Sequence, residues 1–131
     1  MADARTAIGL LLKHLYKAVH LSSPESRHAM CKASYLAGRA INISKTTAPH
    51  ALSYAITSYF GVPHGQAVGL TLGAFLVYNS QVTDEDVADG RGADYVRYTI
   101  QGLNELLGCA DAAASQNRIL NFMRSIGLKT C

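Results

Sequence analysis

The stretch from His50 to Ser80, HALSYAITSYFGVPHGQAVGLTLGAFLVYNS, decides the fold. Its first eleven residues are typical of a helix, and the Gly61–Pro63 break ends that helix. A second helix is expected to begin near His64, and its apolar residues on all sides predict a buried element. Gly69 and Gly73 lower the intrinsic helix propensity but allow a neighbour to approach closely. The stretch therefore predicts two helices joined by a tight break.

Two further helices are expected before this stretch. Over Thr6–His20 apolar residues recur at spacings of three and four, which is the stripe of an amphipathic helix; they are Ile8, Leu11, Leu12, Leu15 and Val19. Ser22 lies three residues before Glu25, a capping pattern that predicts a helix over Pro24–Ala40. The segment Asn42–Pro49 is poor in helix formers and predicts a loop.

The C-terminal part of the sequence predicts two more helices. The acidic, glycine-bearing segment from Asp84 to Asp94 indicates a surface connection. Helices are expected over Ala93–Leu107 and Asp111–Ile126, with Gly108 and Gly127 as C-terminal stops. Because strand alternation of useful length and internal repeats are absent from the sequence, we predict an all-α helical bundle of about six helices.

Composition limits the classes of protein to consider. The chain has 131 residues, 49% hydrophobic and 16% charged, which fits a single domain with a core. The formal charge of +3 comes without a run of like charges and gives no support to nucleic-acid binding. Cys31, Cys109 and Cys131 lack metal or disulfide spacing, which favours a reducing, cytoplasmic setting. Apolar stretches are too short for a membrane span, and the start does not resemble a signal peptide, so we expect a soluble protein.

Two histidines give the clearest chemical signal. His50 and His64 each follow a proline and each stand near an expected helix start. Their separation is not the i, i+4 spacing that places two ligands on one helical face. A helix from His50 to Phe60 spans about 15 Å, so the following break would have to return the chain. From the residues alone, a shared metal ion and two separate structural histidines both remain possible. The remaining histidines are interpreted as structural: His14, His20 and His28.

The run Ala37–Leu70, AGRAINISKTTAPHALSYAITSYFGVPHGQAVGL, resembles the metal-binding region of the iron-containing alcohol dehydrogenases. In that family a His, followed 14 residues later by the His of a PHG motif, supplies two of four metal ligands. His50 and His64 match these ligands, and Pro63 and Gly65 match the residues flanking the second. Dehydroquinate synthases and glycerol dehydrogenases, with an HGE-type motif, are a weaker match.

The resemblance implies a metal-dependent oxidoreductase. Such an enzyme interconverts a small-molecule alcohol and an aldehyde or ketone by hydride transfer with NAD or NADP, using Fe²⁺ or Zn²⁺, and a homo-oligomer is expected. Tyr54 stands where many members have a second His facing the active site, which implies a catalytic, proton-relaying role. Lys45, Thr46 and Thr47 could contact a carboxylate or phosphonate on the substrate, or form a solvated loop.

The sequence also departs from the family pattern. Residues 1–131 are expected to form a single but incomplete all-α domain, because the glycine-rich dinucleotide-binding unit is absent from them. The other two ligands, an Asp and a His four residues later, are expected before residue 1, since Asp3 is followed at that spacing by Ala7. We expect this chain alone to be inactive. A non-catalytic helical module left by truncation is the alternative function.

Overall fold

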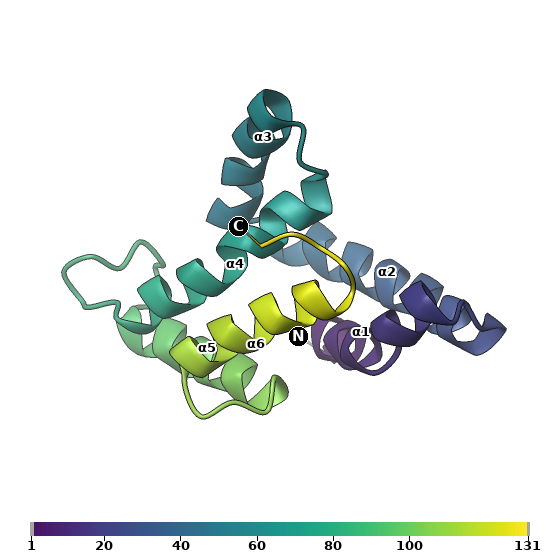
Figure 1. Cartoon of the computed structure of the whole chain (residues 1–131). Helices are drawn as coiled ribbons and strands as arrows, with labels where there is room; N and C mark the ends of the chain where they lie inside the picture. Colours follow the sequence, from purple (N-terminus) through teal and green to yellow (C-terminus); the bar gives the residue numbers. More distant parts are fainter. Residues whose placement is uncertain (1, 131) are drawn as a thin grey trace. The chain divides into compact units, whose positions relative to one another are not determined.

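The computed structural model describes residues 2–130, which form helices and no strand (Figure 1). The helices are α1 (Ala2–His20), α2 (Pro24–Ser44), α3 (Ala48–Phe60), α4 (His64–Ser80), α5 (Ala93–Leu106) and α6 (Ala112–Ser125). The predicted all-α class is confirmed. No helix of this part of the chain combines the length and hydropathy of a membrane span. Cys31 and Cys109 are free thiols, and Cys131 lies outside the described residues.

Residue contacts divide the chain into two compact units. The first contains residues 2–47 and 125–127, and α1 packs against α2 within it. The buried apolar side chains of this helix pair are all small, which lets the two helices approach closely; they are Ala7, Ala29 and Ala33. An ion pair of 3.1 Å between Arg39 Nε and Asp3 Oδ2 also joins the two helices.

The start and the end of α2 both differ from the prediction. Ser23, not Ser22, is the N-cap, and its Oγ accepts a hydrogen bond from the backbone N–H of Ser26 at 3.2 Å. Ser22 instead donates its hydroxyl to Ala18 O in the last turns of α1. At its other end α2 continues to Ser44, so the expected loop over 42–49 shortens to residues 45–47. Pro49 lies in the first turn of α3, where its missing N–H costs nothing.

The second unit contains residues 48–124 and 128–130, with its apolar core between α4, α5 and α6. Leu76, Ile100 and Ala112 form the buried centre of this core. The prediction that α4 is buried all round is wrong for the described residues, because Leu72 and Tyr78 are exposed. Close packing at the α4 glycines is confirmed: a Cβ on Gly69 would meet Met123, and one on Gly73 would meet Gln116. Gly108 and Gly127 adopt positive φ angles after α5 and α6, as expected of helix stops.

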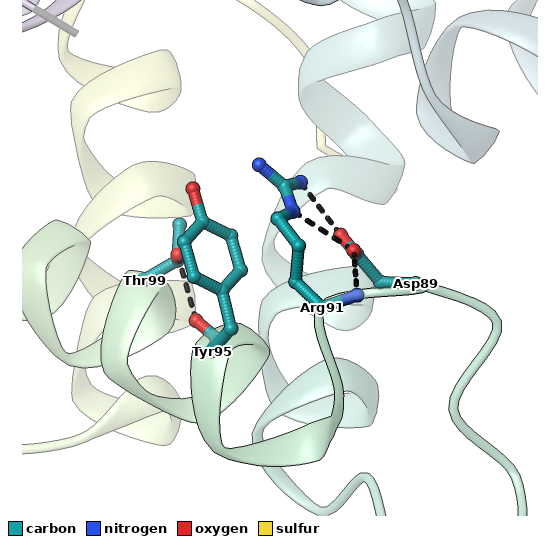
Figure 2. Close-up of polar contacts among 4 residues, drawn as sticks. All are labelled: Asp89, Arg91, Tyr95 and Thr99. Carbon is teal, nitrogen blue, oxygen red and sulfur yellow. Dashed lines mark hydrogen bonds and ion pairs between the residues drawn. The ribbon is translucent and has the colours of Figure 1, made fainter.

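Arg91 holds the end of the connection between α4 and α5 (Figure 2). Arg91 donates from Nε and Nη2 to the two carboxylate oxygens of Asp89, at 2.9 and 2.7 Å. Its guanidinium also lies 3.9 Å from the centre of the Tyr95 ring in the first turn of α5. The predicted acidic surface connection is therefore present, and the arginine ties it to the helix that follows.

Candidate metal centre

The first turns of α3 and α4 carry the two histidines of the candidate site. Gly61 has a φ of +67° and its N–H donates to Thr57 O, which ends α3. Pro63 then takes the N-cap position of α4, so that His64 is the first helical residue. Because α3 packs against α4, the break returns the chain as the sequence required.

The imidazole rings of His50 and His64 lie beside each other. Their centroids are 5.2 Å apart and their planes are inclined by 69°. His50 is half-buried and His64 is exposed. The two rings are adjacent, as a shared metal ion would require, while their role as metal ligands stays a prediction.

Tyr54 also contacts the His64 ring. The centroids of the two rings are 5.6 Å apart and their planes differ by 30°, which is a stacked arrangement. The Tyr54 side chain is 64% exposed, so its hydroxyl group can meet a ligand arriving from solvent. A hydroxyl group at this place can both donate and accept a hydrogen bond.

Ser53 is the residue of this site that the sequence did not single out. Its side chain is 0% exposed. The hydroxyl donates to His50 O at 2.6 Å and lies 3.1 Å from His64 Nδ1. Serine hydroxyls in helices often donate to a carbonyl one turn earlier. The spacing of three residues between His50 and Ser53 was therefore the one sequence feature that could have indicated this contact.

The donor set is compatible with a divalent metal but is only part of a site. Imidazole nitrogen is a good ligand for both Fe²⁺ and Zn²⁺. Among residues 2–130 no group of three or more His, Cys, Asp or Glu side chains is placed to hold a metal ion. His50 and His64 therefore fit two positions of a coordination shell and leave the others to other residues.

The remaining sequence candidates lie in the first unit. Lys45, Thr46 and Thr47 are exposed and form the short link between α2 and α3. The Lys45 backbone has φ 63° and ψ −173°, a region nearly confined to glycine, and its N–H donates to Ile41 O. This strained conformation ends α2.

The other three histidines belong to no group of three or more possible metal ligands in the described part of the chain. His14 is buried in α1, and His28 is exposed on α2. His20 donates from Nε2 to Ser125 O at 2.9 Å, because a carbonyl oxygen can only accept. For His20 this is a structural contact, in agreement with its interpretation from the sequence.

A cavity of about 430 Å³ lies at the break before α4. Its lining consists of Gly61, Val62, Pro63, Gln66, Leu70, Lys129 and Thr130. Gln66 Nε2 donates to Lys129 O at 2.8 Å, which holds the C-terminal segment against α4. Neither His50 nor His64 lines this cavity, so it is not the metal site itself.

Comparison with known proteins identifies the family. Residues 2–130 match the C-terminal region of the Fe-containing alcohol dehydrogenase family. Over 103 residues, 79% of this chain, the sequence is 40% identical to phosphonoacetaldehyde reductase of Streptomyces viridochromogenes, and it covers 26% of that protein. It is 32% identical to 1,3-propanediol dehydrogenase of Klebsiella pneumoniae over 98% of this chain and 34% of the relative.

A solved structure gives the same result. Sulfoacetaldehyde reductase of Bifidobacterium kashiwanohense, determined in complex with NAD⁺, matches 98% of this chain with 34% identity and a TM-score of 0.73. The match covers 31% of that protein, so the chain spans about a third of the length of the relatives it resembles. With the match to the family over residues 2–130, these similarities show that the chain belongs to the iron-containing alcohol dehydrogenase family and corresponds to its C-terminal helical region.

Proposed function

We propose that this chain is the metal-holding helical part of an NAD(P)-linked alcohol dehydrogenase that interconverts a small alcohol and its aldehyde or ketone. The observation that carries the proposal is the pair of adjacent imidazoles, His50 and His64, contributed by the first turns of two successive helices. In this proposal residues 1–131 are one incomplete helical domain. The dinucleotide-binding domain and the missing ligands belong to the remaining two thirds of the family's length.

His50 and His64 would hold the metal through ring nitrogens, and the ion, Fe²⁺ or Zn²⁺, would supply Lewis-acid polarisation of the substrate oxygen. Tyr54 stacks on the His64 ring and is exposed, which supports a role for its hydroxyl in exchanging a hydrogen bond or a proton with a ligand beside that ring. NAD or NADP would supply the hydride donor or acceptor, held in this proposal by the dinucleotide-binding domain.

Lys45, Thr46 and Thr47 are proposed to recognise an acidic group on the substrate. They are exposed, and they directly precede the helix that carries His50. Two relatives are named for acetaldehydes that bear a phosphonate or sulfonate group. A small aldehyde with such an anionic group is therefore the proposed substrate class. In the intact enzyme, Lys45→Gly should raise KM for phosphonoacetaldehyde and leave KM for propanal unchanged, while Lys45→Arg should behave like the parent; an equal effect on both aldehydes would contradict this assignment.

A cytoplasmic location and a homo-oligomeric assembly complete the proposal. The free thiols of Cys31 and Cys109 support a reducing compartment. Exposed aromatic side chains on α3, among them Tyr59 and Phe60, support burial against another protein surface.

Zinc titration of the ¹⁵N-labelled 131-residue chain tests the metal assignment. We expect weak binding that perturbs the ring resonances of His50 and His64, because two imidazoles form only half a site. His28→Ala removes an exposed histidine outside the pair and should leave the response unchanged, whereas His50→Ala should abolish it. Zinc responses confined to the other histidines would overturn the assignment and favour a non-catalytic helical module. Alcohol oxidation by this chain with added metal and NAD(P) would contradict the proposal that residues 1–131 are an incomplete domain.

A further inference from the structure

Ser53 links the two histidines of the candidate metal centre. It is fully buried on α3, one turn after His50. Its Oγ lies 2.6 Å from the backbone O of His50 and 3.1 Å from Nδ1 of His64. Both contacts are within hydrogen-bonding distance, so one hydroxyl group must serve two partners.

The identity of these partners determines where the protons lie. A backbone carbonyl carries no proton, so the 2.6 Å contact between two oxygens requires the single hydroxyl proton of Ser53 to point at His50 O. The Ser53 oxygen can then only accept from His64. Nδ1 of His64 must therefore carry a hydrogen, and in a neutral imidazole this leaves the lone pair on Nε2.

We propose that Ser53 is a positioning residue that fixes the His64 ring in its Nδ1–H tautomer, so that Nε2 presents its lone pair to a metal ion. The presentation of Nε2 to a metal ion rests on the proposed function, whereas the tautomer of His64 does not. Partners of the non-ligating nitrogen commonly set the tautomer and orientation of metal-binding histidines. Tyr54, stacked on the same ring, restricts its rotation further.

Long-range ¹H–¹⁵N correlation spectra of the 131-residue chain test the tautomer directly. They are recorded at alkaline pH, where imidazoles are neutral. In the parent chain we expect His64 to be protonated at Nδ1. In Ser53→Ala the acceptor is lost, and His64 should shift towards Nε2–H or become a mixture of both tautomers.

Ser115→Ala is the matched control. Ser115 is also fully buried, and its hydroxyl donates to Asn104 Oδ1 at 2.7 Å and not to a histidine. This variant loses a buried serine hydrogen bond and should leave the His64 tautomer unchanged. The spectrum of the parent chain keeps the inference testable if Ser53→Ala does not fold.

Zinc titration separates this inference from the metal assignment. If both hold, Ser53→Ala should weaken zinc binding by about 10- to 100-fold, and Ser115→Ala should not. An Nδ1–H His64 whose resonances do not respond to zinc would support the role of Ser53 and overturn the metal site. A His64 protonated at Nε2 in the parent chain, or unchanged in Ser53→Ala, would overturn the role of Ser53 whatever zinc does.

Discussion

Gly73 of α4 and Gln116 of α6 are in such close contact that Gly73 has no room for an added carbon atom. A Cβ built on Gly73 would lie 2.8 Å from Gln116 Cγ and 3.0 Å from Gln116 Cα. Because the second atom belongs to the backbone, a side-chain rotation cannot relieve the clash. We expect Gly73→Ala to lower the free energy of unfolding by about 1–3 kcal/mol, measured by urea denaturation.

Gly65→Ala is the control for this substitution. Gly65 lies in the same helix, and a Cβ there would meet nothing within 4 Å. Its effect on the free energy of unfolding should stay below about 1 kcal/mol. Equal losses in both variants would show that the helix, and not the contact with Gln116, is responsible.

Ser115 and Asn104 form a buried hydrogen bond between α6 and α5, so removing the hydroxyl should destabilise the fold. In Ser115→Ala the amide oxygen of Asn104 loses its donor, which costs about 1–3 kcal/mol for a buried polar group. Thermal unfolding followed by circular dichroism measures this loss. A midpoint identical to that of the parent chain would contradict the assignment of this bond as a stabilising one.

Acid should weaken the connection held by Arg91 (Figure 2). Side-chain hydrogen bonds from Arg91 lower the pKa of Asp89 to about 2, below its ordinary value of 3.8. A carboxyl group with a lowered pKa stabilises the fold above its unfolded pKa, and this contribution disappears as the pH falls through the folded pKa. Urea midpoints of the parent chain and Asp89→Asn should differ at pH 6 and converge between about pH 4 and pH 2. A difference independent of pH would contradict the ion pair as its source.

Apolar side chains exposed on α3 should make the isolated chain self-associate. Tyr59 and Phe60 are 82% and 77% exposed, and Leu52 on the same helix is also exposed. Exposed apolar side chains favour association, because burying them removes apolar surface from water. We expect concentration-dependent light scattering and binding of a dye that fluoresces on apolar surface, both reduced in Phe60→Ser. A monomeric, dye-negative parent chain would contradict this prediction.

Strong local signals made most of the fold predictable. The Gly61–Pro63 break, the glycine stops and the close approach at Gly73 each depend on backbone constraints that a sequence shows directly. The predicted cap and C-terminal end of α2 were wrong, because several weak preferences compete at both ends of this helix. Ser22 and Ser23 are both good caps, and Ser44, a poor helix former, bonds back to Ala40 O inside the helix.

Periodicity could not show that His50 and His64 would meet, because they lie on different helices and the geometry of the turn decides their separation. The resemblance to a family supplied that pairing. Ser53 was missed for a related reason. One serine in a helix is unremarkable in sequence, and its importance depends on a ring that arrives from the next helix.

The bond between His20 Nε2 and Ser125 O has a consequence for the order of folding during synthesis. Its partners are 105 residues apart, although α1 and α2 of the same unit are neighbours in sequence. A ribosome adds about 5–20 residues per second, so Ser125 follows His20 by about 5–20 s. Local helix pairs form far faster than this. The α1–α2 pair therefore emerges and pairs early, and the nascent chain must wait seconds for the carbonyl that completes its first unit.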